Sequence, residues 1–158
     1  MQLNPNVTED LAAMLRNGMA TMGSKLTTVS DEVFGQRLVD IWSVFYGHTL
    51  PYLEAVFIPL EDNKATDSLR DLDVAISIRH LALKAFAECI IQNHQTKLKA
   101  AVHLRFSSIQ HSLMGAEVLG RLSQMLLALV TLEGQSATNE FVADILNALR
   151  QARRKSQP

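Results

Sequence analysis

Apolar residues recur at intervals of three and four along most of this chain, and no other feature of the sequence constrains the fold as strongly. This spacing places them on one face of an α-helix. The clearest stripes run through residues 11–22, 34–45, 118–132 and 141–149. No proline interrupts the chain between Pro59 and Pro158. The pattern predicts an all-α fold, a helical bundle of about five or six helices.

Glycines and prolines set the expected helix boundaries. We expect the first helix to end at Gly23 and the second to begin at Ser30. Pro51 disfavours helical geometry in the residue before it, so it should start a new helix over residues 51–58. That helix should be short, because Pro59 interrupts it. Together the two prolines predict a proline-bracketed turn within the bundle.

The second half of the chain continues the helical pattern with fewer boundary signals. Residues 61–68 are polar and are predicted to form a loop. The run 74–79 alternates like a strand, but the helical stripe continues past it to Ile90, so we expect one helix from the end of the loop onward. Gly115 should mark a break. The helix over 118–132 is apolar around much of its circumference, which predicts a place at the centre of the bundle.

Length and composition narrow the class of protein. The 158 residues fit one domain over 1–158, with an ordered core of about residues 6–150 and a short basic C-terminal tail. The apolar fraction of 47% excludes wholesale disorder, and the net charge of −1 argues against nucleic-acid binding. The uncharged apolar stretch 122–132 is far shorter than the roughly 20 residues that span a bilayer. The charged residues near the N-terminus do not fit a signal peptide. The single Cys89 cannot form an internal disulfide, which favours a reducing, cytoplasmic location.

The sequence contains no recognisable catalytic, metal-binding or phosphate-binding motif. None of the five histidines pairs with another at i, i+4, and no glycine-rich phosphate loop or Gly-x-Ser-x-Gly elbow is present. We therefore expect no metal, no cofactor and no enzymatic activity. Cys89 lies among apolar residues and is predicted to pack as an inert side chain. A catalytic site assembled from distant residues, such as His80 and Glu88, stays open as an alternative.

Basic residues suggest a second alternative. Between Glu88 and Glu117 the chain carries basic residues and no acidic one. They could contact an anionic lipid surface, which would make the protein a peripheral module at the plasma membrane, or they could simply lie on a solvated helix face. The candidate contact residues are Lys97, Lys99, Arg105, Arg153, Arg154 and Lys155.

The segment between the two prolines is unusual for a generic bundle. It runs from Leu50 to Leu60 and contains a single charged residue, Glu54. The helical spacing separates its side chains into two neighbouring faces: one holds Tyr52, Val56 and Pro59, and the other holds Leu53, Phe57 and Leu60. If both faces are buried, one of them can be covered by another protein.

This segment and a second stretch resemble the HbrB-like family, which includes the animal Protor proteins. The first family pattern is a tryptophan, an aromatic pair and then Leu-Pro-x-Leu-x-Ala-x-Phe-x-Pro. Its matching residues here are Trp42, Phe45, Leu50, Pro51, Leu53, Ala55, Phe57 and Pro59. The second stretch matches at Ile78, Arg79, Leu81, Ala82, Leu83, Phe86 and Ile90. The family's Arg-Asp pair after the phenylalanine is Ala87-Glu88 in this chain.

The resemblance implies a function. Members of this family are accessory subunits of target of rapamycin complex 2, so the chain is expected to bind the Rictor-type scaffold and the TOR kinase complex. It would then support signalling to AGC kinases and the actin cytoskeleton without catalysing a reaction. Known members carry long flanking tails, so a compact homologue or a shortened form is expected. The expected protein contact is Trp42, Leu50, Pro51, Tyr52, Phe57, Pro59 and Leu60. A purely internal role for these residues is the competing interpretation.

Overall fold

The computed structural model describes residues 7–61, 77–108, 113–131 and 136–155. These ranges contain helices and no strand, so the predicted all-α class is confirmed. The helical segments join into five continuous rods. The segments are α1 (Val7–Thr27), α2 (Asp31–Val44), η1 (Phe45–Thr49), α3 (Leu50–Glu61), α4 (Ile78–Phe86), η4 (Ala87–Ile91), η5 (Gln92–His94), α5 (Gln95–Ser108), α6 (Leu113–Val130) and α7 (Ser136–Lys155).

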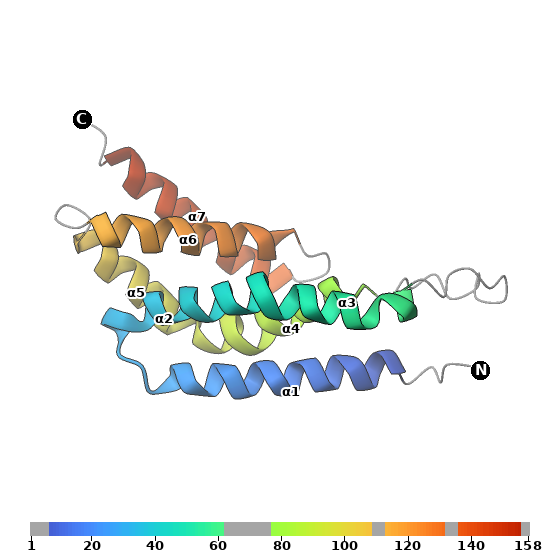
Figure 1. The fold of residues 1–158 in the computed structure, drawn as a ribbon. Helices are drawn as coiled ribbons and strands as arrows, with labels where there is room; N and C mark the ends of the chain where they lie inside the picture. Colours follow the sequence, from blue (N-terminus) through green and yellow to red (C-terminus); the bar gives the residue numbers. More distant parts are fainter. Residues whose placement is uncertain (1–6, 62–76, 109–112, 132–135, 156–158) are drawn as a thin grey trace.

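Two of the rods are composite. Figure 1 shows α2, η1 and α3 following one another along a single line, with α1 and α4 running alongside in the opposite direction. The other composite rod leads from α4 through η4 and η5 into α5, which turns away toward α6 and α7. In this arrangement α2 contacts α5, α6 and α1, while α3 packs on α4.

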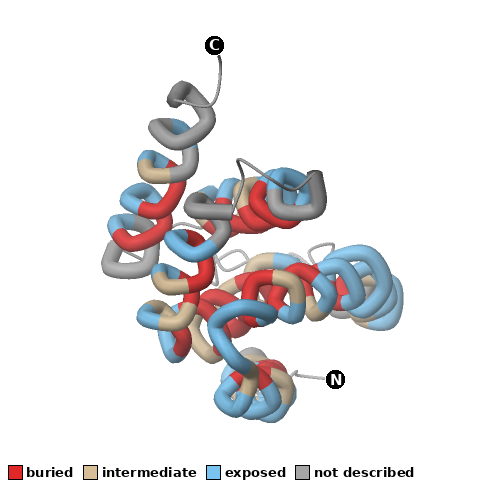
Figure 2. Tube along the Cα trace, turned by 90° about the vertical axis from the view of Figure 1, so that its left-hand side faces the viewer, coloured by how far each residue is buried: buried red, intermediate tan, exposed pale blue. Residues whose placement is uncertain are grey.

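The core lies where these rods face one another. Figure 2 shows the buried residues gathered on the inward sides of the helices and the exposed residues on their outer sides. Phe34, Phe45, Phe86, Leu122 and Met125 are among the buried side chains of the core. These residues belong to the stripes expected from the sequence, which is why the amphipathic spacing located the core correctly.

Prolines do not divide the second rod as expected. The prediction of a break before Pro51 is wrong, because Leu50 has helical dihedral angles (φ −64°, ψ −49°) and its N–H donates to the carbonyl of Phe45. Five residues separate that donor and acceptor, which is the wider π-type turn. The widening accommodates Pro51, which lacks an N–H and would otherwise crowd the carbonyl of Gly47 four residues earlier. The chain also stays helical through Pro59 to the end of α3.

The glycines that were expected to mark helix ends also lie inside helices. The first helix continues past Gly23 to Thr27, and α6 begins at Leu113, before Gly115. The predicted start of the second helix is correct, because Ser30 has extended geometry and precedes α2 as its N-cap residue. Glycine in a helix interior costs only about 1 kcal/mol relative to alanine, so packing overrides it.

Two other expectations need correction. Ser77 is extended and its hydroxyl accepts the backbone N–H of His80, so α4 begins only at Ile78. The expected helix start near residue 68 and the loop over 61–68 lie mainly outside the described residues. The helix α6 packs on α2, α5 and α7, but it is not enclosed on all sides as a central helix would be, because Gln124 and Leu127 are exposed. Within the described ranges, no helix combines the length and apolar character that a membrane crossing requires.

Candidate interaction site

Aromatic side chains from both family motifs form the junction between η1 and α4. The ring of Phe45 stacks on that of Phe86 with centroids 5.0 Å apart, and Trp42 meets the same Phe86 edge-on at 5.1 Å. On its other side Trp42 stacks with Tyr46 at 4.8 Å. The two motifs, distant in the sequence, are therefore one packed unit. Such aromatic pairs add about 0.5–1.5 kcal/mol each beyond their buried area.

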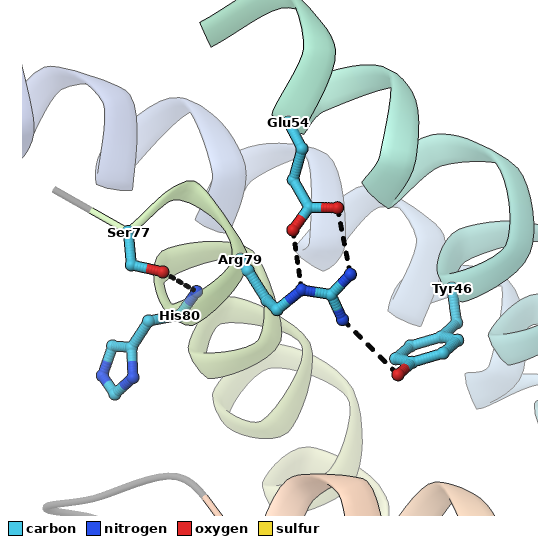
Figure 3. A network of polar contacts seen from close by, with 5 residues as sticks. All are labelled: Tyr46, Glu54, Ser77, Arg79 and His80. Atoms are coloured by element: carbon cyan, nitrogen blue, oxygen red, sulfur yellow. Dashed lines mark hydrogen bonds and ion pairs between the residues drawn. The ribbon is translucent and has the colours of Figure 1, made fainter. Parts of the chain in front are cut away.

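A polar network covers the outer edge of this junction (Figure 3). Arg79 on α4 makes a two-pronged ion pair with Glu54 on α3: Nε donates to Oε1 at 2.6 Å and Nη2 donates to Oε2 at 3.0 Å. A third donor, Nη1, lies 3.4 Å from the hydroxyl of Tyr46. The hydrogen bond with Glu54 raises the pKa of Arg79 above its ordinary value, although partial burial acts in the opposite direction. The pair neutralises the carboxylate of Glu54 and ties α3 to α4.

The residues predicted to contact a protein differ in how far they are buried. Leu50 is fully buried and cannot contact a partner directly, and Trp42 leaves only 8% of its surface open. By contrast, Pro51 and Tyr52 are exposed, and Tyr52 leaves 69% of its surface open. Phe57 is half-buried, packed against the core. The side chains of Pro59 and Leu60 lie outside the described residues.

An apolar outer face of α3 results from this difference in burial. We call the exposed residues Pro51, Tyr52, Ala55 and Val56 the α3 face. Leu53 and Phe57, which the helical spacing places on the neighbouring face, pack inward. Since Glu54 is held by Arg79, the α3 face presents no charged side chain. An uncharged apolar surface on a helix is typical of protein–protein contacts.

Lys97 has a structural position that the sequence did not reveal. Its ammonium group donates to the carbonyl oxygens of Leu26, Thr27 and Val29 at 3.4, 2.5 and 2.7 Å. These carbonyls lie at and just beyond the C-terminal end of α1, where helix carbonyls lack intrahelical partners. An ammonium group has three N–H donors, so all of them are used within the molecule.

Of the other predicted lipid-contact residues, Lys99 does not share a surface with Lys97. Lys99 is two residues further along α5 and its ammonium lies 5.3 Å from the ring centroid of Phe141 on α7. Residues two apart on a helix point in different directions. Arg105, Arg153, Arg154 and Lys155 belong to the described helices α5 and α7, but their side chains are outside the described set.

Hollows open at more than one place on the surface of the described part of the molecule. One, of about 320 Å³, lies between η1 and α6. Another, of about 370 Å³, lies between α1 and the η4–α5 region and is lined in part by Cys89, Asn93 and His94. Burial, together with the charge of Glu88, raises the pKa of the Cys89 thiol. No group of three or more potential metal ligands occurs among the residues that the structure describes.

Sequence reasoning missed the link between Glu54 and Arg79. Both residues stood inside the two motifs, and Glu54 was the single charge in an apolar segment, which is a signal that a partner is required. Nothing in the sequence identified Arg79 as that partner, because the two residues are 25 positions apart. For the enzyme alternative, His80 is half-buried at the start of α4 and Glu88 lies two turns later in η4.

Comparison with known proteins agrees with the motifs. The profile of the HbrB-like family matches residues 2–99, which include both motifs, the aromatic junction and the Arg79–Glu54 pair. The chain belongs to the HbrB-like family. Among curated proteins, this HbrB-like chain is similar to a protein of the fission yeast Schizosaccharomyces pombe named "Target of rapamycin complex 2 subunit bit61". The two are 22% identical over 156 residues, covering 89% of this chain and 36% of the relative.

The HbrB-like chain thus spans little more than a third of that relative's length. No solved structure matches it significantly.

Proposed function

We propose that this HbrB-like protein is a non-catalytic accessory subunit of target of rapamycin complex 2. The family relationship and the name of the fission yeast relative support a role of this kind. More specifically, we propose that the protein binds the Rictor-type scaffold and thereby supports signalling to AGC kinases and the actin cytoskeleton, in the cytoplasm or at the plasma membrane.

One structural observation supports a docking role: the α3 face. Tyr52 and Val56 are 69% and 50% exposed, one turn apart on the same side of the helix. They belong to the segment that carries the first family motif. Large side chains at i, i+4 intervals are the usual anchors of a helix that enters an apolar groove on another protein.

Co-purification tests the proposal. The full chain, tagged, is recovered from cells that contain the intact complex, and the Rictor-type subunit is measured by immunoblot. We expect Tyr52→Ala to reduce recovery by about fivefold or more, because exposed aromatic residues dominate interface energies. The matched control is Met14→Ala, since Met14 on α1 is equally exposed at 69%. Equal recovery with both variants would contradict docking through the α3 face, and no recovery with the wild-type chain would contradict the accessory role.

The anionic-lipid alternative has less support in the described residues. Lys97 uses its three donors on α1, and Lys99 lies over an aromatic ring on α7. A lipid surface would need several free cations on one side of the molecule. Flotation with phosphatidylserine vesicles tests this alternative directly: binding that is lost in Lys99→Glu would restore it.

A further inference from the structure

The hollow between η1 and α6 has a composition that points to a ligand. It is lined by Trp42, Ser43, Tyr46, Gly47, Arg121 and Gln124. Small residues keep it open: a Cβ built on Gly47 meets no atom within 4 Å. The stacked rings of Trp42 and Tyr46 supply its aromatic wall. Its volume of about 320 Å³ is at the low end for a small-molecule site and suits part of a peptide.

Hydrogen-bond donors predominate in this hollow. Trp42 is only 8% exposed and lines the hollow, and its indole ring carries one N–H donor. Buried indole N–H groups usually have a partner. Arg121 uses one N–H on Glu117 at 2.8 Å and has further donors, and the amide of Gln124 adds more. None of the six lining residues carries a carboxylate, so the hollow offers donors and lacks an anionic acceptor.

We propose that this hollow receives an aspartate or glutamate side chain from an acidic, partly apolar peptide segment of a protein partner. The carboxylate accepts from the indole N–H of Trp42 and pairs with Arg121. The apolar part of the segment lies along α3, because exposed Pro51 and Ala55 follow Gly47 at intervals of four residues on the same side of the helix. This inference deepens the proposed accessory function and rests on it for the existence of a protein partner.

Charge favours a carboxylate over a phosphate. The hollow has one fully charged cation, Arg121, and that side chain already shares its charge with Glu117. A single carboxylate matches this partial charge, whereas a doubly charged phosphate usually requires two or more cations. The apolar continuation along α3 also suits a peptide better than a lipid headgroup.

Trp42 makes the test direct, because it is the single tryptophan of the chain. The full chain is titrated with the capped tetrapeptide Leu-Glu-Glu-Leu and with its uncharged counterpart Leu-Gln-Gln-Leu. The readouts are the fluorescence of Trp42 and the NMR resonance of its indole N–H, which moves downfield when an acceptor binds. We expect saturable changes with the acidic peptide. The uncharged peptide should bind more weakly, by about fivefold at least. Inorganic phosphate and phosphatidylserine vesicles are titrated in parallel.

Three variants locate the binding. Gly47→Met fills the hollow and should weaken peptide binding about tenfold, while circular dichroism shows the fold retained. Arg121→Gln should weaken it about fivefold. The matched control is Arg37→Gln, because Arg37 is also an exposed arginine that pairs with a carboxylate on its own helix, Asp40 at 3.9 Å, and it does not line the hollow. Arg37→Gln should bind within about twofold of the wild type.

Several results would overturn the inference. These are an unmoved indole resonance with the acidic peptide, equal responses to the acidic and uncharged peptides, unimpaired binding by Gly47→Met, or a response to phosphate or vesicles in place of the peptide. If the peptide fails while the Rictor-type scaffold still co-purifies, the acidic-peptide inference is wrong and the accessory function stands. If peptide binding is confirmed while the scaffold does not co-purify, the proposed function is wrong and the hollow serves another acidic partner.

Discussion

At the scale of the residue, Lys97 shows how one side chain can hold two helices together. Its ammonium group on α5 lies against three carbonyl oxygens at the end of α1, 68 to 71 positions earlier in the chain. A cation at a helix C-terminus also opposes the negative end of the helix dipole. The sequence showed the charge and its apolar neighbours, but it could not show this contact, because a long-range contact depends on how the helices pack.

Replacing Lys97 should therefore destabilise the fold. We expect Lys97→Met to lower the free energy of unfolding by about 1–3 kcal/mol, since it leaves partly buried carbonyls without a charged donor. Lys99→Met, two residues away on the same helix, should cost about 1 kcal/mol or less, because it loses only the contact with the ring of Phe141. Urea unfolding followed by circular dichroism measures both. Equal losses would show that the contacts of Lys97 with α1 contribute little.

Cys89 should react slowly. Burial and Glu88 raise the pKa of its thiol, so less of the reactive thiolate exists near neutral pH. Alkylation by iodoacetamide, followed by mass spectrometry, should be slower in the folded chain than in urea, and Glu88→Gln should accelerate it in the folded chain. As pH rises above the ordinary thiol pKa, the unfolded chain ionises first, so this group lowers stability in alkaline solution. A folded-state rate equal to that in urea would refute the expectation.

At the scale of the element, π-type turns join segments that the sequence separates. Periodicity predicted correctly that Phe34, Leu38 and Phe45 share the buried side of one helix. The junction at Pro51 was predicted wrongly, because the rule for residues before proline describes the average chain. Here Leu50 is fully buried, and its packing holds it in helical geometry despite the proline. The residue before a proline does prefer extended geometry, but tertiary packing overrides that preference at Leu50.

Two helical glycines should respond oppositely to the same substitution. Gly47→Ala should stabilise the fold by up to about 1 kcal/mol, because the added Cβ meets open space and alanine favours a helix. The free energy of unfolding of Gly23→Ala should be about 1–3 kcal/mol lower than that of Gly47→Ala. The reason is that the added Cβ would lie 3.1 Å from the carbonyl oxygen of Cys89 in η4. Thermal unfolding of both variants measures the difference. A similar rise in Tm for both would mean that α1 can move away from η4 without cost.

At the scale of the whole molecule, the aromatic residues of the two family motifs meet in the core, although other residues of the first motif lie on the surface. Trp42 and Phe45 from the first motif pack on Phe86 from the second, and Arg79 joins them at the edge. The all-α class followed from periodicity, and the aromatic residues of the two motifs pack against one another. The order of the helices in space could not be predicted, because amphipathic stripes show which side of a helix is buried and not against which neighbour.

Hydrogen exchange should reveal this core. We expect the slowest amide exchange in α2 and in the α4–η4 region, whose inward residues are almost fully buried, and faster exchange in α3, which packs through fewer residues. Exchange followed by mass spectrometry of peptic fragments measures the order. Faster exchange in α2 than in α3 would contradict the packing described above.

The unbroken helix through η1 has a mechanical consequence. Because backbone hydrogen bonds continue across Pro51, the direction of α3 is set by α2, which is anchored in the core. A loop or hinge at the proline would let α3 swivel, and a partner attached there would be tethered loosely. A continuous helix instead fixes the direction of α3, so a partner bound to α3 is held at a fixed angle to the rest of the protein.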